Sequence, residues 1–235
     1  MDYNKPSRKK KANEDYLRKM GMLKDENPYK EEEEEQKKLF LIICEGKNTE
    51  PRYFEKFPVP SKTVIIEGGC NTKTALVEYA ISIKDLDKYA GREIWCVYDF
   101  DIKLDESATQ PKDFNNSIRM AEANGLHVAW SNDAFELWFI LHYQKLDNEL
   151  TRDELYKILK SLWNLESFSN EAKTEEFCKG HYERHGGTLS EMQKLAIHRA
   201  KELHENYEGR KDYSKHCPCT TVYLLVDELN KNLKK

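Results

Sequence analysis

The sequence predicts an α/β protein: a parallel sheet with helices on both faces, followed by an α-helical C-terminal half. Four short apolar runs alternate with segments whose apolar residues recur at the helical period. Continuous apolar runs are typical of strands buried on both faces, and their alternation with helices indicates parallel strands joined by right-handed crossovers. The strand-like runs stop near residue 147, which sets the C-terminal half apart.

The four predicted strands each end at a polar residue or a glycine. They cover residues 38–44, 63–66, 93–98 and 126–130. The clearest helical pattern between them covers 75–86, where six apolar side chains share one face. Shorter helical patterns cover about 50–57, 112–123 and 134–143. Together these elements predict one α/β domain over 37–146.

Helix-start signals replace strand signals in the C-terminal half. Thr151 with Glu154, and Thr188 with Glu191, match a capping box, in which the Thr hydroxyl accepts from a backbone N–H and the Glu side chain reaches back. Each pair precedes an amphipathic stripe of apolar residues. We therefore expect 147–235 to form helices that pack on the sheet.

Charge is unevenly distributed over the 235 residues, whose formal net charge is −4. A basic block over 5–11 precedes an acidic run over 31–35. Both blocks have too little apolar surface to offset the entropy of ordering, so 1–36 is predicted to be a disordered or loosely helical arm. The basic block either contacts phosphates or serves as a solubilising tail.

The sequence contains no recognisable export signal or membrane span. Its first residues lack the apolar core of a signal peptide, and no apolar stretch approaches the roughly 20 residues that a membrane span requires. The six cysteines show no paired framework. We therefore expect a soluble cytoplasmic protein with reduced cysteines and no membrane partner.

Acidic residues follow two of the predicted strands at the point where each strand ends. Glu45 follows the first strand, and Asp99 and Asp101 follow the third. Ligands of an open parallel sheet bind beyond the carboxyl ends of its strands, so these side chains are expected at one edge. Residues two apart in an extended segment point the same way, so both aspartates can face one ion. Hard oxygen ligands favour Mg²⁺ or Mn²⁺ over zinc.

This acidic group is the predicted active site. Protein-bound Mg²⁺ relies on one or two carboxylates plus substrate phosphates, so the group fits phosphoryl transfer or phosphodiester cleavage. An Asp-x-Asp sequence alone is also common in solvated loops. Its pairing with Glu45 at a strand end favours a metal site with Glu45, Asp99 and Asp101 as ligands.

Four segments of the chain, in order, form a recognisable pattern. They are ICEGKNTEPRYF at 43–54, WCVYDFD at 95–101, SNDAFELWFILHY at 131–143 and CPCTTVYLLV at 217–226. Together they resemble the motifs of the RloB family, and the resemblance covers about 38–232. The first segment resembles that family's opening motif, roughly hhCEGxxTExxYF, in which h is an apolar residue.

The chain departs from the family pattern at four positions. Ile102 stands where a further acid is usual, with Asp105 three residues on, and Asp133 stands in place of Pro. Cys217 and Cys219 replace Asn and Ser. None of these departures removes the central carboxylates, but the missing acid bears on whether a second metal ion binds.

The resemblance implies a Toprim-like fold and a metal-dependent nuclease of bacterial anti-phage, abortive-infection loci. It implies a nucleic-acid substrate, either RNA (tRNA included) or DNA, and an ABC-type ATPase as protein partner. By that similarity Glu45 acts in acid/base chemistry or on a metal, while Asp99 and Asp101 hold Mg²⁺. A homodimer is left open.

Four further residues are candidates for the site. Lys47 lies in a glycine-containing turn after Glu45, where its ammonium can neutralise a scissile phosphate, and Arg52 can also reach phosphate. Asn132 follows the fourth strand and Glu136 lies one turn later, so both can reach the metal edge. We predict Glu45, Lys47 and Glu136 as catalytic residues, and Lys47, Arg52 and Asn132 as nucleic-acid-binding residues. An exposed lysine and buried hydrogen bonding are the structural alternatives.

Other polar residues have structural interpretations. Glu50 is a first-turn acid of the next helix, and His142 is a core histidine in an apolar helix. Cys178, His181 and His185 are loosely spaced for a structural zinc site. His181, Tyr182, Arg184 and His185 either form a surface that faces nucleic acid or, as we prefer, belong to an exposed loop.

Two other functions stay open at this stage. Primase-like nucleotidyl transfer keeps the metal site, although the sequence contains no glycine-rich nucleotide cradle. A non-catalytic regulatory or phage-sensing partner of the ATPase fits two features: the chain has no net positive charge, and it lacks the further acid at the position of Ile102. An assay with purified protein distinguishes the three functions. A nuclease cleaves strands, a primase-like protein incorporates nucleotides, and a regulatory partner does neither.

Overall fold

The computed structural model describes Tyr16, Met20 and residues 38–60, 64–69, 73–101 and 109–233. Contacts divide the chain into two units, 1–37 and 38–235. Apart from Tyr16 and Met20, the predicted arm over 1–36 lies outside the described residues, as do Ile102 and Asp105. The sheet and the helices that pack on it belong to the second unit.

A five-stranded sheet forms the centre of this unit, in the order β2-β1-β3-β4-β5. The strands are β1 (Leu39–Cys44), β2 (Val64–Glu67), β3 (Arg92–Asp99), β4 (His127–Asn132) and β5 (Cys219–Thr220). The first four pair in parallel, in the register that aligns Ile43 with Cys96. The predicted α/β class and its four parallel strands are confirmed.

The fifth strand corrects the expectation that strands end near residue 147. Cys219 and Thr220 pair antiparallel with Asn132 and Ser131 of β4. A strand of two residues is too short to show a hydrophobic period, so the sequence pattern does not reveal it. The Ser131 and Thr220 hydroxyls are 2.9 Å apart, which helps to fix this edge of the sheet.

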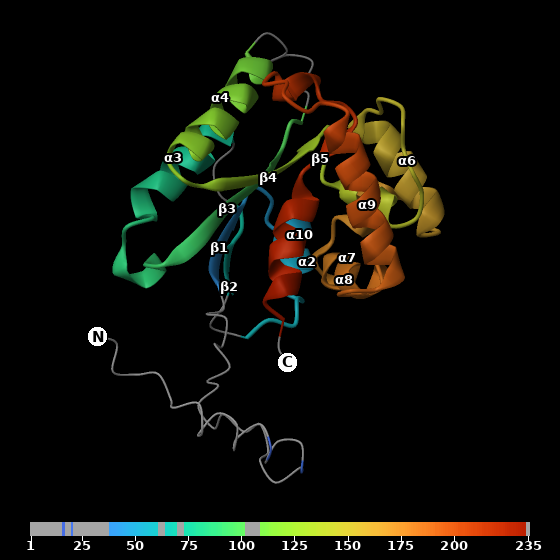
Figure 1. The fold of residues 1–235 in the computed structure, drawn as a ribbon. Helices are drawn as coiled ribbons and strands as arrows, with labels where there is room; N and C mark the ends of the chain where they lie inside the picture. Colours follow the sequence, from blue (N-terminus) through green and yellow to red (C-terminus); the bar gives the residue numbers. More distant parts are fainter. Residues whose placement is uncertain are drawn as a thin grey trace, which may run out of the picture. The chain divides into compact units, whose positions relative to one another are not determined.

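Helices cover both faces of the sheet, because side chains of a strand alternate between its faces (Figure 1). Leu41 and Ile43 pack with α3 (Lys73–Ile83) and α4 (Gln110–Ala123) on one face. Phe40, Ile42 and Cys44 pack on the other face. That second core is completed by α2 (Thr49–Phe54), α5 (Glu136–Leu141), α9 (Glu191–Glu205) and α10 (Val222–Lys231).

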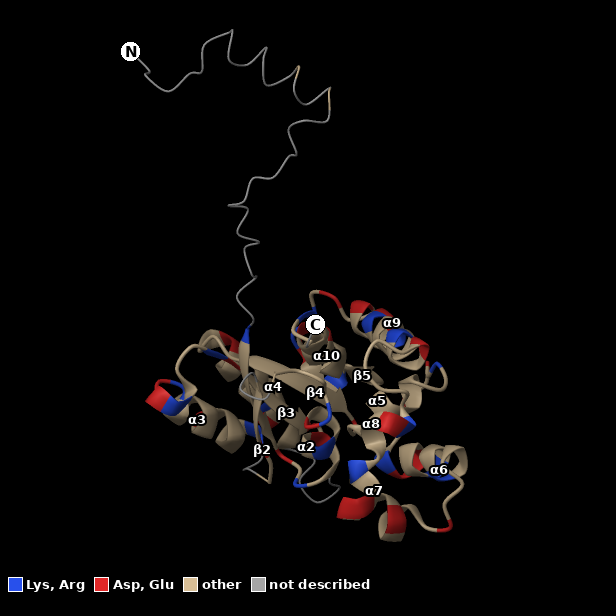
Figure 2. Cartoon of the chain, turned by 90° about the horizontal axis from the view of Figure 1, so that it is seen from below, with Lys and Arg blue, Asp and Glu red and all other residues tan. Residues whose placement is uncertain are grey.

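The remaining helices lie mostly in the C-terminal half. They are the 3-10 helix η1 (Asp87–Tyr89), α6 (Arg152–Leu162), the π-helical turn η3 (Phe168–Ala172), α7 (Glu175–Lys179), α8 (His181–Arg184) and the 3-10 helix η4 (Tyr213–Lys215). Figure 2 shows acidic and basic residues interspersed along α9 and around α7. Every helix within the described ranges is too short or too polar to cross a membrane.

One of the two predicted capping boxes is confirmed and the other is wrong. Thr151 caps α6: its hydroxyl accepts from Glu154 N, and the Glu154 carboxylate accepts from Thr151 N at 2.8 Å. The N-cap of α9 is Ser190 instead of Thr188, and its hydroxyl accepts from Gln193 N at 3.1 Å. Ser190 and Gln193 also have the spacing of a capping box, which the Thr188 pattern obscured.

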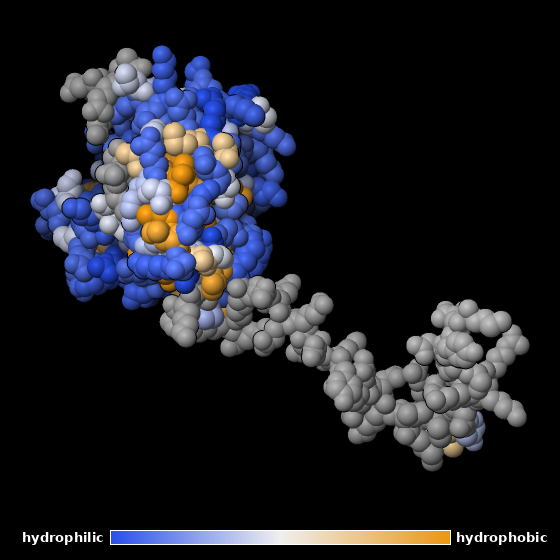
Figure 3. Space-filling model, turned by 90° about the vertical axis from the view of Figure 1, so that its left-hand side faces the viewer, coloured by the Kyte–Doolittle hydropathy of each residue, from blue (hydrophilic) through white to orange (hydrophobic). Residues whose placement is uncertain are grey.

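The edge strand β2 is less buried than its neighbours. All four of its residues are half-buried, whereas β1 is fully buried from Phe40 to Cys44. Figure 3 shows apolar side chains gathered in a strip among hydrophilic ones on the side of the molecule that carries α3 and α4. Leu86, on the turn after α3, is 52% exposed.

Candidate active site

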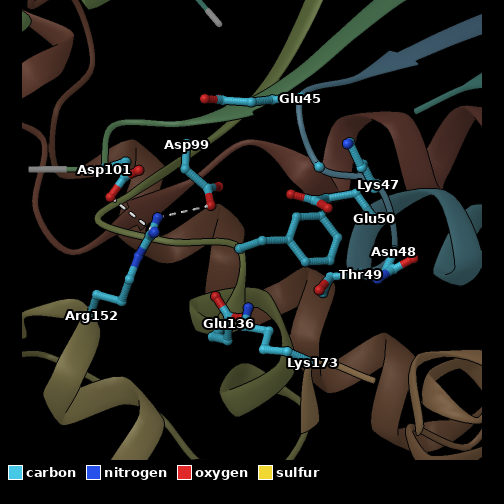
Figure 4. Close-up of a pocket in the computed structure, with 12 residues that line it drawn as sticks. Glu45, Lys47, Asn48, Thr49, Glu50, Asp99, Asp101, Glu136, Arg152 and Lys173 are labelled. Atoms are coloured by element: carbon cyan, nitrogen blue, oxygen red, sulfur yellow. Dashed lines mark hydrogen bonds and ion pairs between the residues drawn. The ribbon is translucent and has the colours of Figure 1, made fainter. Parts of the chain in front are cut away.

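Beyond the carboxyl ends of β1 and β3 lies a cavity of about 280 Å³. The β1–α2 turn, the end of β3, α5, the start of α6 and the segment after η3 all contribute to its lining (Figure 4). Its charged lining residues are five acids and three cations: Glu45, Glu50, Asp99, Asp101, Glu136, Lys47, Arg152 and Lys173. At formal charge, five acids against three cations leave two negative charges in excess.

Glu45 enters the pocket directly after β1. Its backbone N–H continues the sheet by donating to Val97 O at 2.9 Å, so the position of Glu45 is fixed by pairing with β3. Burial raises the pKa of the Glu45 carboxyl, partly opposed by the positive charge of Lys73. Its Oε2 atom is buried and has no hydrogen-bond partner among the described residues. A buried carboxylate oxygen without a partner is a candidate ligand atom.

Asp99 and Asp101 both bind the guanidinium of Arg152 (Figure 4). Nη2 lies 3.4 Å from Oδ2 of Asp99, and Nη1 lies 2.9 Å from Oδ1 of Asp101. The extended geometry predicted for this segment is wrong, since β3 ends at Asp99 and Asp101 has a φ of +48°. Backbone bonds anchor the turn instead: Asp101 N donates to Asp133 O at 3.0 Å.

Burial raises the pKa of Asp99 well above its ordinary value, and the nearby Glu50 carboxylate adds to the rise. Arg152 opposes both effects by stabilising the ionised form of Asp99. The pKa of Arg152 is itself raised: burial alone would lower it, but the negative charges of Asp99 and Asp101 outweigh burial. The guanidinium therefore stays charged and acts as the counterion of this pair.

A second acidic pair lies across the pocket. Glu136, the first residue of α5, binds the ammonium of Lys173, and its side chain is 4% exposed. Burial raises the pKa of Glu50 to about 7, and the charge of Glu136 contributes. A Cβ on residue 46 would collide with the Glu50 carboxylate, so Gly46 allows this side chain to fold back into the pocket. The pocket thus has a second pair of acids, Glu50 and Glu136, in addition to Asp99 and Asp101.

Lys47 lies exposed at the same turn. Its aliphatic stem packs over Gly69, where a Cβ would lie 2.6 Å from Lys47 Cγ. Gly69 has a φ of +71°, which favours glycine, and its N–H donates to Gly46 O at 2.8 Å. The two glycine-containing turns therefore hold each other beside the pocket and position Lys47 there.

The donor chemistry of the pocket fits a hard divalent cation. Its acids offer only oxygen ligands, as Mg²⁺ and Mn²⁺ prefer, and one buried oxygen of Glu45 lacks a partner in the described part of the chain. Glu45, Asp99 and Asp101 are the residues that would hold it. In the described part of the chain, however, no three His, Cys, Asp or Glu side chains already stand close enough together to coordinate a metal. Arg152 instead binds an oxygen from each aspartate.

The comparisons with known proteins address the family. The protein-family model described as RloB-like protein matches residues 40–229, most of the chain. The chain belongs to the RloB-like family. Neither a curated protein nor a solved structure matches it. All eight charged residues of the pocket lie within the matched range of this RloB-like chain.

Two predicted residues of the RloB-like chain are not brought to the pocket. Asn132 is 1% exposed and donates from Nδ2 to Ser214 O at 3.0 Å, so its expected placement at the metal edge is wrong. The physical reason is its place in the sheet, where Asn132 pairs with β5. Arg52 does not line the pocket either. Its guanidinium binds Glu55 at 2.8 Å and Glu175 at 2.9 Å.

Three charged residues of the pocket were missed by the sequence prediction. Glu50 lies within the first RloB-like motif, which is a usable signal, but its place in the first turn of a helix favours a structural interpretation. Arg152 and Lys173 lie outside all four motif segments. Arg152 directly follows the predicted N-cap Thr151, so its position at the start of α6 was predictable but its direction was not.

Three histidines, His142, His181 and His185, belong to a buried aromatic cluster. His181 and His185 are both 1% exposed, so the preferred interpretation of this segment as an exposed loop is wrong. The His185 ring stacks on Phe139, with centroids 4.4 Å apart and an interplanar angle of 13°. His142 is buried, as a core histidine should be, and its Nδ1 lies 2.9 Å from Trp138 O. These rings pack against aromatic neighbours instead of facing solvent.

Proposed function

We propose that this RloB-like protein is a metal-dependent nuclease that hydrolyses phosphodiester bonds of RNA or DNA. The observation that carries the proposal is the convergence of Glu45, Asp99 and Asp101 on one pocket at the carboxyl ends of β1 and β3. That edge is where open α/β sheets bind ligands. Glu45 contributes a buried oxygen that has no hydrogen-bond partner among the residues the structure describes, which supports its role as a ligand.

The charge balance of the pocket supports a requirement for a divalent ion. The five acids of the pocket outnumber its three cations, and their ionised carboxylates would repel a phosphodiester, because like charges in a partly buried site interact strongly. A bound Mg²⁺ or Mn²⁺ would stabilise the charge that develops on the phosphate and lower the pKa of the attacking water. Glu45, Asp99 and Asp101 would hold the ion.

The side chains of the pocket have separate roles in this proposal. Lys47 at the mouth pairs with a non-bridging oxygen of the scissile phosphate. Glu136 holds Lys173 at the inner wall, so that its ammonium faces the phosphate without needing to be ordered by substrate. Glu50, whose pKa is raised to about 7, can hold or release a proton near neutral pH.

Membership of the RloB-like family supports the proposed biological setting. We infer that the protein acts in the cytoplasm as the effector of an anti-phage abortive-infection system, together with an ABC-type ATPase. RNA, tRNA included, is the first substrate class to test, with DNA beside it. An effector of this kind is toxic when active, so the partner is expected to control its activity.

The test is cleavage by the purified protein, with and without the neighbouring ATPase and ATP. End-labelled tRNA, other RNA, and single- and double-stranded DNA are incubated with Mg²⁺, with Mn²⁺ or with EDTA. The proposal requires fragments that depend on the metal and disappear in both Glu45→Gln and Asp99→Asn. Glu191→Gln is the matched control, since Glu191 is 83% exposed on α9. Cleavage that survives in both site variants would refute the proposal.

One observation favours a second candidate, a non-catalytic regulatory partner of the ATPase. Arg152 already satisfies Asp99 and Asp101, as in a purely structural ion-pair network. On this alternative, phage protection in cells persists in Glu45→Gln and Asp99→Asn, and neither nucleic-acid fragments nor incorporated nucleotides appear. Nucleotide incorporation instead of cleavage would indicate primase-like transfer.

A further inference from the structure

We propose that Arg152 is a built-in competitor of the metal ion: its guanidinium occupies the cation position between Asp99 and Asp101, and it leaves when a divalent ion binds. The inference rests on the metal site of the proposed function and goes beyond it. Metal binding then exchanges one cation for another.

The contacts of Arg152 match those of a substitute cation. It bridges the two aspartates by using one oxygen of each, Oδ2 of Asp99 and Oδ1 of Asp101. Mg²⁺ binds oxygen at about 2.0–2.1 Å, so an ion that bridged these same two oxygens would lie in the space that the guanidinium fills, with its nitrogens 3.4 and 2.9 Å from them. Repulsion between the guanidinium and a divalent ion also opposes joint occupancy.

The position of Arg152 in the fold allows its side chain to move while its backbone stays. Arg152 is the first residue of α6, and its N–H donates to Oδ2 of Asp133 at 3.1 Å. The capping box of Thr151 and Glu154 holds the same turn. The side chain is 29% exposed, and its buried Nε has no hydrogen-bond partner among the described residues. Only the two aspartate contacts therefore have to break.

The released guanidinium stays beside the reaction site. Arg152 lines the same pocket as Lys47 and Lys173, so a change of side-chain rotamer leaves it within the cavity lining. A free guanidinium binds two phosphate oxygens through its planar fork, whereas an ammonium acts as a compact point charge. Metal binding would thus free Asp99 and Asp101 from Arg152 and, in the same step, release the guanidinium to bind phosphate. Without metal, the ion pair would keep the aspartates from binding an ion and Arg152 from binding phosphate.

Metal affinity is the direct measure of this competition. Because binding and displacement are linked, removing the competitor must tighten metal binding. Mn²⁺ and Mg²⁺ are titrated calorimetrically into the full chain as wild type, Arg152→Gln, Arg152→Lys and Asp99→Asn. We expect Arg152→Gln to bind Mn²⁺ at least about tenfold more tightly, and Asp99→Asn to lose binding. Arg152→Lys should be intermediate, since an ammonium cannot bridge both carboxylates in the same way.

Lys38→Gln is the matched control. Lys38 also bridges two carboxylates, Glu93 at 2.9 Å and Glu228 at 2.7 Å, but it lies outside the pocket lining. Its loss should leave the metal affinity unchanged. Thermal unfolding gives a second readout that needs no activity: in EDTA Arg152→Gln should melt below wild type, and added Mn²⁺ should raise its melting temperature by more than that of wild type.

The outcomes separate this inference from the proposed function. If wild type binds metal, Asp99→Asn does not, and neither Arg152 variant binds more tightly, the competitor is refuted while the metal site stands. Weaker binding in Arg152→Gln refutes it too, since Arg152 would then support the bound ion. If no form of the protein binds Mn²⁺ or Mg²⁺, both the competitor and the metal-dependent nuclease are refuted.

Discussion

Two groups of buried titratable side chains meet at α5, and they are built differently. Glu136 is the first residue of α5 and belongs to the acidic pocket, whereas His142 follows its last residue and belongs to the histidine cluster with His181 and His185. The acids surround a cavity of about 280 Å³, and three of them, Asp99, Asp101 and Glu136, are paired with cations. The histidines are packed ring against ring with aromatic side chains.

The same physical effect acts on both groups with opposite results. Burial penalises the charged form of any group, so it raises the pKa of Glu45, Glu50 and Asp99 and lowers the pKa of His142 and His181. The histidines avoid the penalty by staying neutral. The acids are instead kept near cations beside an open space. Acids that are buried beside a cavity despite the cost of burying their charge indicate a functional site. Histidines that stay neutral inside a packed core indicate a structural role.

The largest effect is expected from Glu45→Gln, which should separate activity from stability. Catalysis should fall by about 10²–10³-fold, comparable to the loss of one well-placed electrostatic group. The free energy of unfolding without metal should stay the same or rise, because a neutral amide escapes the burial penalty that raises the pKa of Glu45. Urea denaturation in EDTA and cleavage assays measure the two quantities. A large loss of stability would instead make Glu45 a structural residue.

Acidification should destabilise the protein through the histidine cluster. The pKa of His142 is lowered to about 4 from its ordinary 6.5, so its contribution to stability is complete above pH 6.5 and is lost as pH falls from 6.5 through 4. The loss from His142 alone is on the order of 3 kcal/mol, at 1.36 kcal/mol for each pKa unit. Unfolding free energies between pH 8 and pH 4 measure it.

Substitution of His142 tests the assignment of that slope. His142→Gln should show a shallower decrease of stability with acid than wild type, whatever its stability at pH 7. His198→Gln is the control, because His198 is 68% exposed on α9. Equal slopes in wild type and His142→Gln would show that the acid sensitivity arises elsewhere.

Lys173→Met should destabilise the pocket by leaving the Glu136 carboxylate buried without its partner. Breaking a fully buried ion pair costs about 3–5 kcal/mol. We expect about 2 kcal/mol here, because the Lys173 side chain is 37% exposed and water screens part of the interaction. Lys194→Met removes an exposed pair with Glu191 and should change stability by less than about 0.5 kcal/mol.

The double variant sharpens this result. Adding Glu136→Met to Lys173→Met removes the unpaired charge and should recover most of the lost stability. The comparison is made by urea denaturation at pH 7.5. If the double variant is no more stable than Lys173→Met, the buried charge is not the cause of the loss.

The contrast between the two groups also shows what sequence patterns can predict. The strands β1 and β3 were predictable because a buried strand is a local apolar run, and the acids at their ends followed from the sheet rule. The turn at Asp101 was not, because its positive φ is imposed by bonds to a neighbouring segment near Asp133. Local patterns thus predict that Glu45, Asp99 and Asp101 lie at the carboxyl edge of the sheet. They do not predict the backbone conformation at Asp101 or the contacts of these side chains.

Two of the three cations of the pocket depend on tertiary packing. Arg152 and Lys173 reach the cavity from α6 and from the segment after η3, which contact α5 and each other only in the folded chain. Their sequence neighbourhood predicts a charged helix start and a polar turn, and nothing in it distinguishes them from surface residues. The same limit applied to His181 and His185, whose polar surroundings suggested a loop although aromatic side chains bury them.

The smallest effect is expected from Glu50→Gln, and its sign is opposite to that of the histidine cluster. The pKa of Glu50 is raised to about 7 from 4.5, so its contribution to stability is complete below pH 4.5 and is lost as pH rises through 7. At pH 8 without metal, Glu50→Gln should therefore be more stable than wild type by about 1 kcal/mol, since the amide escapes the charge penalty but loses the charge-assisted backbone bond. At pH 4 the two proteins should be equally stable. A gain at pH 4 as large as that at pH 8 would mean that the substitution acts through packing and that Glu50 does not titrate in the pocket.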